Sequence, residues 1–376
     1  MPNFVPQNPA NGQYTIIYMN TFGNIFRLTT FGESHGAAIG GVIDGMPSGI
    51  DVDEAFIQSE LSRRRPGQSG ISTPRNESDR VEILSGVFEG KTTGTPIGFA
   101  IRNENQHSKD YSQLKDVFRP SHADFTYQRK YGIRDYRGGG RQSARETAAR
   151  VAAGAFAKLA LQKAGVEIEA YTSQIGSVEM ERGYRWYGSS EIESNAVRCP
   201  DSKVAALMEN EVKNALADGD SVGGIVSCIV RGCPVGLGEP VFGKFHAAMA
   251  AAQMSINAAR GFELGDGFEA ASMRGSQYND PFTADSDGAV TMLTNHNGGV
   301  LGGITCGSDV TFRMAFKPVP TISRQQQTVD IDGRQVTVAA RGRHDPCVVP
   351  RAVPVVEAMA AIVTLDFLLL RQSNGI

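Results

Sequence analysis

Cysteines are few in this 376-residue chain, and their arrangement excludes two kinds of protein. There are five, an odd number, scattered between residues 199 and 347 with no C-x-x-C pair. A disulfide framework or a cysteine-ligated zinc site requires paired or regularly spaced cysteines. We therefore predict no structural metal and a reducing, cytoplasmic setting.

A strong net charge and long apolar runs are also missing. The formal net charge is -3, so the chain as a whole offers no positive field for nucleic acid or for an anionic membrane. The longest apolar stretch, residues 355–370, is interrupted by Glu357 and Asp366 and is shorter than the ~20 residues that span a membrane. We interpret this stretch as a buried helix, and we expect no nucleic-acid or membrane partner.

Several well-known catalytic motifs are absent as well. None of the six histidines belongs to an H-E-x-x-H motif or a comparable ligand pair, so we expect no catalytic metal. The chain contains no G-x-S-x-G motif and no P-loop. The glycine-rich run at residues 217–226 does not open a predicted helix, as the first turn of a Rossmann fold would, so no dinucleotide fold is predicted.

One folded unit accounts for the length of the chain. No linker, charge block or low-complexity tract interrupts its middle. Residues 1–18 have neither a basic segment nor a sustained apolar run, so they do not resemble a secretory signal, and we predict a flexible leader. Residues 19–376 are predicted to form a single domain, because a chain of this length can bury a large core.

Glycine is abundant instead, with 43 residues separating short β-branched segments and a few helices. Asp51 and Glu54 form a D-x-x-E capping pattern, which predicts a helix running to the arginines at 63–65. Ser143 and Glu146 form an S-x-x-E capping box, which predicts the start of an alanine-rich helix.

Two further helices and an internal similarity complete the predicted organisation. Residues 203–217 suggest one helix, and Pro354 suits the first turn of the last one. Residues 40–50 and 227–237 both have the pattern of a strand that ends in G-x-P-x-G. This similarity suggests a duplicated α+β architecture, whereas the alternative is chance recurrence of glycine-proline turns in a glycine-rich chain.

Four arginine-bearing turns suggest binding sites for anions. In residues 137–147, glycines leave the backbone bare and a helix start follows, with Arg141 and Arg145 beside it. Backbone N–H groups, the positive end of a helix dipole and guanidinium groups all favour phosphate or carboxylate. The alternatives are an ordinary turn with solvated arginines or a weak RNA-binding motif. The other turns are Arg63 to Arg65, Arg119 with His122, and Arg343 to Asp345, and a small substrate with several negative charges would need them all.

Taken together, these turns resemble those of the chorismate synthase family in order and spacing. The most distinctive segments are "FGESHGAAIGGVIDGMPSGI", "GGRQSARETAARVAAGA" and "RGRHDPC", and the resemblance runs from Met19 to the last helix. It implies an anti-1,4-elimination in which 5-enolpyruvylshikimate 3-phosphate loses phosphate and a C6 proton to give chorismate, the last step of the shikimate pathway. It also implies a need for reduced FMN, with NADPH as the reductant if the chain reduces its own flavin.

The resemblance implies roles for particular residues. His122 is the expected general acid on the departing phosphate, and His35 is expected to supply or hold the proton on the flavin ring. Asp345 is expected to act as a general base that takes the proton from the flavin N5 and passes it on. His344 is expected to be structural. The substrate anions are expected to bind four arginines: Arg64, Arg119, Arg145 and Arg343.

A second set of residues is implied for the flavin. It comprises Arg141, Gln142, Ser143, Asn257, Ala258, Gly302, Lys317, Pro318, Val319, Pro320, Thr321 and Arg343. The chain departs from the family at Gly70, where many members have an arginine that Arg65 or Arg75 would have to replace. It also reads "KPVPT" where K-P-T-S-S is common, so backbone groups are expected to make that flavin contact.

The resemblance also implies a fold and an assembly. Family members share a β–α–β sandwich assembled as a homotetramer, so we expect an α+β, single-domain β-α-β sandwich with internal pseudo-duplication. Two other functions remain open from the residues. A flavin oxidoreductase with true hydride transfer would need a nicotinamide site, for which no fingerprint is visible. An anion- or RNA-binding module without catalysis would keep its function after substitution of His35 or Asp345.

Overall fold

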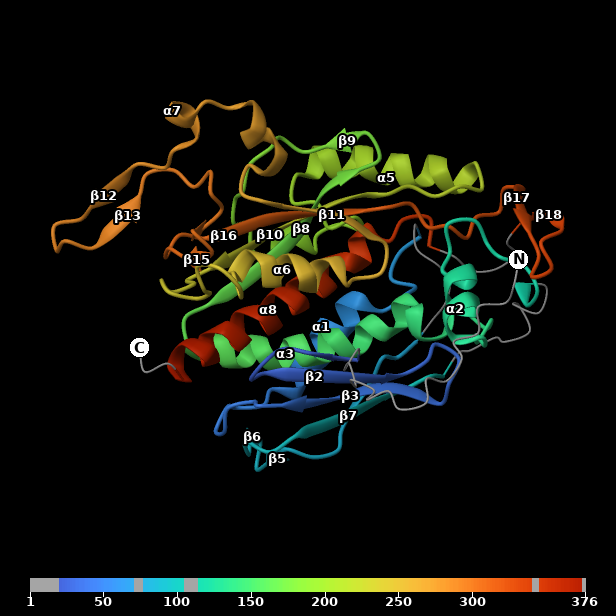
Figure 1. Cartoon of the computed structure of the whole chain (residues 1–376), viewed down its shortest axis with the longest axis horizontal. Coiled ribbons are helices and arrows are strands. Elements are labelled where there is room, and N and C mark those ends of the chain that lie inside the picture. The colour runs from blue at the N-terminus through green and yellow to red at the C-terminus, as the bar shows by residue number, and fades with distance from the viewer. Residues whose placement is uncertain (1–19, 71–76, 105–113, 340–344, 374–376) are drawn as a thin grey trace, which may run out of the picture.

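Two five-stranded antiparallel sheets face each other across a layer of helices (Figure 1). The computed structural model describes residues 20–70, 77–104, 114–339 and 345–373, so the leader predicted at 1–18 lies outside the described residues. The first sheet has the order β1 (Thr21–Phe22), β2 (Arg27–Gly32), β3 (Ala38–Asp44), β7 (Ile97–Arg102) and β4 (Val81–Ile83). The second has the order β11 (Ala259–Leu264), β16 (Val310–Phe316), β10 (Gly224–Arg231), β8 (Glu167–Ile175) and β9 (Val178–Glu179). The α+β sandwich predicted from the sequence is confirmed.

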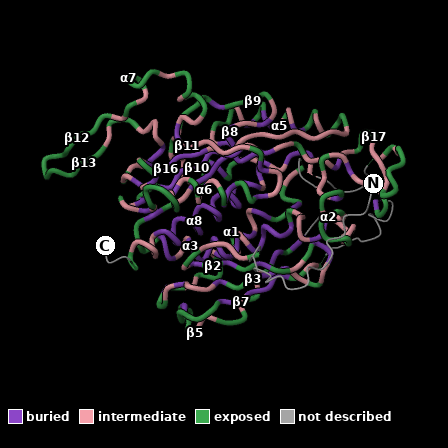
Figure 2. Tube along the Cα trace, viewed as in Figure 1, coloured by how far each residue is buried: buried purple, intermediate pink, exposed green. Residues whose placement is uncertain are grey.

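Four helices fill the space between the sheets. They are α1 (Glu54–Arg64), α3 (Thr147–Lys163), α6 (Phe245–Met254) and α8 (Val349–Ser373). By length and composition α8 could cross a membrane, but 89% of its apolar window is buried inside the fold. It runs through the purple centre of Figure 2 as the main core helix, which confirms the prediction for residues 355–370.

The remaining elements lie around this frame. Helix α5 (Ser202–Ala217) covers the outer side of the second sheet and confirms the helix predicted at 203–217. Strands β12 (Phe282–Ala284) and β13 (Val290–Met292) form a hairpin that projects from the body (Figure 1). The other short elements are α2 (Asp124–Tyr131), α4 (Ser189–Ile192), α7 (Gly275–Tyr278), β5 (Val87–Phe88), β6 (Lys91–Thr92), β14 (Val300–Leu301), β15 (Ile304–Thr305), β17 (Gln326–Val329) and β18 (Gln335–Val338).

The repeated strand-turn pattern marks equivalent places in the two sheets. Strands β3 and β10 are each the central strand of their sheet, and each ends in its G-x-P-x-G turn. The first glycines of these turns, Gly45 and Gly232, have φ values of +76° and +73°, a left-handed conformation that glycine adopts without strain. The duplicated architecture suggested by the sequence is therefore visible in the sheets.

The start of α1 differs from the prediction by two residues. Asp53 is the N-cap, and its carboxylate accepts a hydrogen bond from the Phe56 N–H at 2.9 Å. Asp51, the predicted cap, lies outside the helix and pairs with Lys163 at 3.0 Å and with Lys91. The capping assignment was wrong because two aspartates two residues apart offer the same signal, and Asp51 is instead held in a β-bridge to Lys91.

The capping box predicted for α3 does not form. A 3-10 turn, Ala144–Glu146, separates Ser143 from the helix, and the Ser143 hydroxyl accepts from the Arg145 N–H at 3.3 Å. The Glu146 carboxylate instead accepts from the Thr30 hydroxyl on β2 at 2.9 Å. The Glu146 side chain, which the local pattern assigned to the helix end, thus forms a tertiary contact with the sheet instead.

The last helix also begins earlier than predicted. It starts at Val349, so Pro354 lies inside the helix and Pro350 is the proline of the first turn. A first-turn proline is favoured because its missing N–H would have had no partner within the helix.

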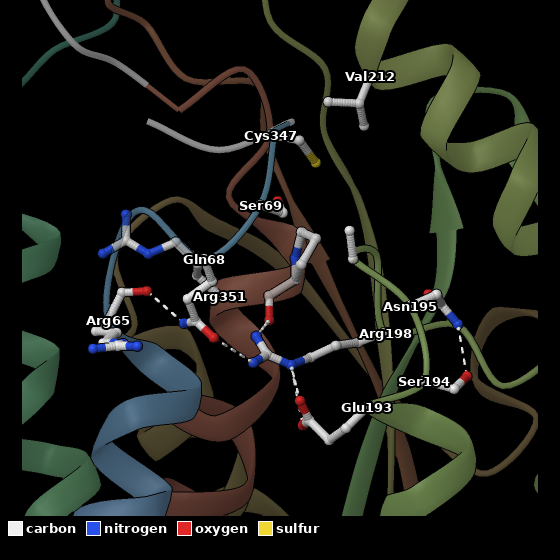
Figure 3. A pocket seen from close by; sticks show the side chains of 12 residues that line it. Arg65, Gln68, Ser69, Glu193, Ser194, Asn195, Arg198, Val212, Cys347 and Arg351 are labelled. Atoms are coloured by element: carbon white, nitrogen blue, oxygen red, sulfur yellow. Dashed lines mark hydrogen bonds and ion pairs between the residues drawn. The ribbon is translucent and has the colours of Figure 1, made fainter. Parts of the chain in front are cut away.

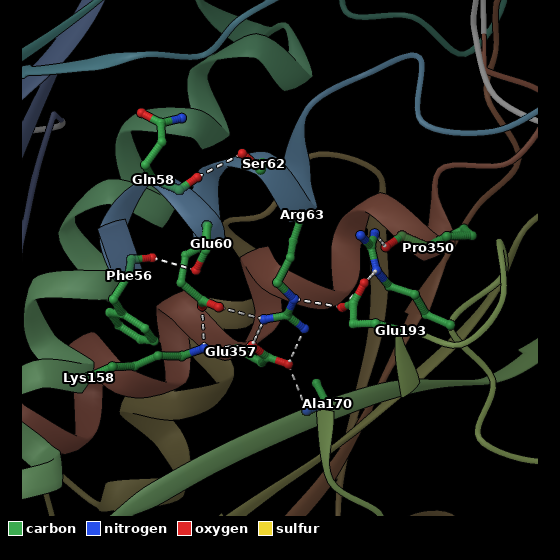
Figure 4. A network of polar contacts seen from close by, with 12 residues as sticks. Phe56, Gln58, Glu60, Ser62, Arg63, Lys158, Ala170, Glu193, Pro350 and Glu357 are labelled. Atoms are coloured by element: carbon green, nitrogen blue, oxygen red, sulfur yellow. Dashed lines mark hydrogen bonds and ion pairs between the residues drawn. The ribbon is translucent and has the colours of Figure 1, made fainter. Parts of the chain in front are cut away.

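A buried ionic network ties the helical layer together (Figure 4). The Glu357 carboxylate on α8 accepts from Arg63 on α1 and from Lys158 on α3, both at 2.6 Å, and from the Ala170 N–H of β8 at 3.1 Å. Burial alone would raise the pKa of Glu357, but the two cations lower it to about 2. The network fixes α1 against α8, and therefore fixes the arginines at the end of α1.

Candidate active site

A cleft of about 400 Å³ lies at one end of the helical layer. Its walls come from the end of α1, the turns before α3, the segment before β11, the end of β16 and the start of α8. It collects most of the residues that the sequence predicted for substrate and flavin. They are Arg64, Arg119, His122, Gln142, Ser143, Arg145, Asn257, Ala258, Lys317, Val319, Pro320, Thr321 and Asp345.

A few of the predicted residues do not line this cleft. His35 is buried behind the wall, with its Nε2 2.5 Å from where a Cβ on Gly138 would lie, and Gly138 itself lines the cleft. Arg141 turns away and donates to the Thr30 carbonyl of β2 at 2.7 Å. Gly302 lies in the turn between β14 and β15, and Pro318 is not among the lining residues. Arg343, His344 and Arg75 lie outside the described residues.

Two of the predicted substrate arginines meet a carboxylate that no sequence motif predicted. Arg64 donates from its terminal nitrogen to Asp79 at 2.6 Å, and Arg145 forms an ion pair with the other oxygen of the same carboxylate. All three side chains are buried. Asp79 belongs to no recognisable motif and is separated in sequence from both arginines, so only the fold reveals the contact.

The third predicted arginine is held by its own turn. The Arg119 guanidinium makes a bidentate contact with Asp124, at 2.7 Å from Nε and 2.9 Å from a terminal nitrogen. Burial would raise the pKa of Asp124, but the hydrogen bonds from Arg119 and the adjacent His122 ring lower it. Such a fork-to-fork contact fixes the plane of a guanidinium and leaves its remaining N–H groups for a ligand.

His122 is held by the same carboxylate. Its Nδ1 lies 3.0 Å from an Asp124 oxygen, and the ring lines the cleft. Burial and the neighbouring Arg119 lower the pKa of His122, while Asp124 raises it. A phosphate group bound beside the ring would favour the protonated form, because a nearby negative charge raises the pKa of a histidine.

Asp345, the predicted base, also lines the cleft, four residues before the start of α8. It forms an ion pair with Arg351, whose Nε donates to the Arg64 carbonyl at 3.1 Å. Arg351 also lines the cleft and was not predicted from the sequence, since it follows the R-H-D-P motif without belonging to it. It connects the predicted base to the end of α1.

Unpaired polar atoms in the cleft wall show that it suits a polar ligand. Arg64 Nε, Gln142 Oε1 and Asn257 Oδ1 are buried and have no hydrogen-bond partner among the described residues. A buried polar group without a partner costs about 1–3 kcal/mol, so such groups usually face a ligand or water. A flavin ring presents N–H and C=O groups along one edge, and apolar residues such as Val319 and Val355 offer a surface for its faces. The cleft residues therefore fit the predicted flavin.

A second cavity, of about 310 Å³, also has Arg351 in its wall (Figure 3). Its best-buried cation, Arg198, is bonded to Glu193 at 2.9 Å and to the Pro350 carbonyl. None of the side chains described around it has a buried polar atom without a partner. The unpaired atoms thus distinguish the first cleft as the candidate active site.

Comparison with known proteins assigns the chain to a family. The family model for chorismate synthase matches residues 26–369. The chain belongs to the chorismate synthase family. Chorismate synthases from Bacteroides thetaiotaomicron and Parabacteroides distasonis are each 59% identical to it, covering 94% and 95% of this chain and 99% of either protein. A solved crystal structure of a chorismate synthase matches with a TM-score of 0.74 and 32% identity over 93% of each chain.

Membership in the chorismate synthase family confirms the resemblance drawn from the sequence. The matched relatives cover nearly the whole chain, so the family assignment applies to the cleft as well as to the sandwich. A small-molecule substrate follows from that assignment.

Proposed function

We propose that this chain catalyses the elimination of phosphate and the C6 proton from 5-enolpyruvylshikimate 3-phosphate, giving chorismate with the aid of reduced FMN. The observation that carries the proposal is the convergence of the predicted substrate and flavin residues, from distant parts of the sequence, on one cleft. The unpaired atoms of Arg64, Gln142 and Asn257 in its wall support a polar ligand there. Reduced FMN, when bound, would supply electron density as phosphate leaves and a position for the C6 proton.

The arginines would bind the anionic groups of the substrate. Arg64, Arg119 and Arg145 are each held by a buried carboxylate, so their guanidinium groups are oriented before the substrate arrives. A substrate with a phosphate and two carboxylates needs several such groups, and a pre-ordered site loses less entropy on binding. We propose the same role for Arg343.

Proton transfer would fall to two residues that line the cleft. His122, beside Arg119, would donate a proton to the departing phosphate, and the phosphate itself would raise the pKa of the ring toward the protonated form. Asp345 would accept the C6 proton, with Arg351 holding its carboxylate. We retain the prediction that His35 holds a proton near the flavin, and its ring would act at the cleft wall formed by Gly138.

For the flavin we propose the residues on the Gln142 side of the cleft. The Asn257 side-chain amide donates to the Gln142 carbonyl at 2.6 Å, which leaves Asn257 Oδ1 as an acceptor for a ring N–H. The Lys317 ammonium donates to the Ser121 carbonyl at 2.7 Å and lies within the same wall. In the "KPVPT" segment the backbone would replace the hydroxyl groups common in the family.

Substitution of the proposed acid and base tests this assignment. We expect His122→Asn and Asp345→Asn each to lower kcat by about 100-fold or more, in line with the loss of a general acid or base, while FMN binding is retained. His246→Gln, a change on α6 outside the cleft, is the matched histidine control and should keep the wild-type rate. Wild-type rates in both cleft variants would contradict the proposal.

We also propose a homotetramer in the cytoplasm. The projecting β12–β13 hairpin exposes Phe282 (66%), Val290 (66%) and Leu293 (69%), which is unusual for side chains left in water. Contact with further copies would cover them, and light scattering on the purified protein would give the mass.

The five cysteines are all free, as expected in a reducing compartment. Supplying oxidised FMN with NADPH would show whether the chain reduces its own flavin.

A further inference from the structure

Asp79 connects two arginines that come from different parts of the chain. Arg64 is the last residue of α1, Arg145 lies in the turn before α3, and Asp79 lies in the segment that leads to β4. One carboxylate oxygen accepts from Arg64 at 2.6 Å and the other pairs with Arg145. The Asp79 side chain is fully buried, so water does not screen these contacts.

The backbone at Asp79 is held in an uncommon conformation. Its φ is +50°, in the left-handed region that costs a non-glycine residue about 1 kcal/mol or more. Gln58 on α1 holds the segment on both sides, because its amide donates to the Asp79 carbonyl at 3.2 Å and accepts from the Val81 N–H at 3.3 Å. Such strain persists where surrounding contacts impose it, and it concentrates at functional sites.

The rest of each guanidinium is held from behind. Arg145 donates from Nε to the Asn103 side chain at 2.8 Å and from a terminal nitrogen to the Arg102 carbonyl at 3.1 Å. Arg64 donates to the Ala144 carbonyl at 3.1 Å, while its Nε has no partner among the residues that the structure describes. Both arginines line the cleft, so their remaining N–H groups are available to a ligand.

Asp79 also offsets the repulsion between these two cations. Burial is the main cause that lowers the pKa of Arg64, Asp79 opposes it, Arg351 and Arg145 add to it, and the net pKa is about 10. Burial would raise the pKa of Asp79, but the two arginines lower it to about 2, so its carboxylate is ionised at any working pH. Without that charge, neighbouring guanidinium groups would repel each other in a site with little water.

We propose that Asp79 is a positioning residue that fixes Arg64 and Arg145 as a pre-ordered pair for one anionic group of the substrate. The proposal rests on the proposed function, since it concerns the substrate of the same cleft. Asp79 does not line the cleft, so it acts through the two arginines. The pair retains one net positive charge, which suits a single phosphate or carboxylate.

Asp79→Asn tests the proposal because it removes the charge and keeps the size of the side chain. We expect the KM for 5-enolpyruvylshikimate 3-phosphate to rise by about tenfold or more, with a smaller fall in kcat, since the arginines bind the substrate before and during the reaction. Calorimetry with FMN-free protein should show the same loss of affinity for 5-enolpyruvylshikimate 3-phosphate.

Rescue by a conservative variant separates positioning from a general loss of stability. The charged groups that face Arg64 are Asp79 from the segment before β4, Arg145 from the turn before α3 and Arg351 from α8. Asp79→Asn removes the only negative charge of this set, so the guanidinium groups, which stay charged at any working pH, repel each other and lose their fixed position. Asp79→Glu, which restores the charge, should bring the KM back toward the wild-type value.

Asp366→Asn is the matched control, because Asp366 is a buried aspartate of α8 that bonds to the backbone of residues 24–26, outside the cleft. It should lower stability while leaving the KM unchanged. An unchanged KM in a folded Asp79→Asn protein would overturn the proposal.

If Asp79→Asn does not fold, Asn103→Ala decides the question. It removes one acceptor of Arg145, and it should raise the KM in the same direction, whereas an unchanged KM would overturn the proposal. A wild-type protein that forms no chorismate would instead contradict the proposed function, so the two failures can be told apart.

Discussion

Replacing Glu357 with glutamine tests whether the buried ionic network holds the helical layer together. Glu357 is 2% exposed, and its carboxylate accepts hydrogen bonds from Arg63, Lys158 and the Ala170 N–H (Figure 4). Glutamine keeps the size of the side chain but removes the negative charge and one acceptor oxygen. Two buried cations then lose their strongest shared partner.

The expected loss of unfolding free energy is large, but it lies at the lower end of the range for a broken buried ion pair. Removing one partner of a buried ion pair typically costs about 3–5 kcal/mol, because the other partner is left uncompensated. Here Glu60 still contacts Lys158 at 2.5 Å and Arg63 at 2.9 Å, so part of the compensation remains. We therefore expect the free energy of unfolding to fall by about 3 kcal/mol, the lower end of that range.

The pH dependence of the loss gives a second, independent signature. The pKa of Glu357 is about 2 in the folded chain and 4.5 in its ordinary state, so the carboxylate stabilises the fold fully above that ordinary value. This stabilisation is lost as pH falls from about 5 toward 2. The difference between the wild type and Glu357→Gln should therefore shrink over that interval.

Equilibrium unfolding in urea, followed by circular dichroism, measures both effects. The control is Glu209→Gln, which breaks a surface pair with Lys213 at 3.6 Å on α5 and should cost less than about 0.5 kcal/mol. Equal unfolding midpoints for the two variants at neutral pH would refute the reasoning. So would a difference between Glu357→Gln and the wild type that stays constant down to pH 3.

Three further predictions concern packing, a buried contact and thiol chemistry. Gly154→Ala should lower the free energy of unfolding by about 1–2 kcal/mol in the same urea assay. The new Cβ would lie 2.3 Å from the Ala358 Cβ, and this overpacking outweighs the better helix propensity of alanine. A stabilised variant would contradict the close α3–α8 packing. Asp366→Asn should lower the free energy of unfolding by about 2–3 kcal/mol, because the carboxylate accepts hydrogen bonds from three successive backbone N–H groups at residues 24–26. A loss below about 0.5 kcal/mol would refute this prediction. In the native protein a thiol reagent at pH 8 should modify Cys306 first. Burial raises the pKa of the other four thiols, which are Cys199, Cys228, Cys233 and Cys347. Rapid modification of two or more cysteines would contradict this prediction.

The fold could be predicted where a pattern is local and repeated. The G-x-P-x-G turns after β3 and β10 identified two equivalent central strands, because a turn with a left-handed backbone favours glycine and is therefore recognisable in the sequence. The prediction of a capping box before α3 was wrong because the Glu146 carboxylate accepts a hydrogen bond from Thr30. Thr30 belongs to the sheet and is distant in sequence, so a local pattern cannot predict this contact. Local patterns therefore predicted the elements better than their ends.

The candidate site shows the same division. Motifs that carry several residues in a fixed order predicted most of the cleft, including His122 and Asp345. They did not predict Asp79 or Arg351, which stand outside those motifs and gain their contacts only when α1, α8 and the turn before α3 meet. Nor did they predict that Arg141 would bond to β2 instead of facing the cleft.

The most direct test of the proposed elimination is an anaerobic reaction with the purified protein. Chemically reduced FMN and 5-enolpyruvylshikimate 3-phosphate are mixed with it, and chorismate absorbance and released phosphate are followed together. We predict that both products appear one-to-one and that neither appears with oxidised FMN. Flavin binding without either product would contradict the proposed elimination, and consumption of NADPH with transfer of hydride to another acceptor would favour an oxidoreductase.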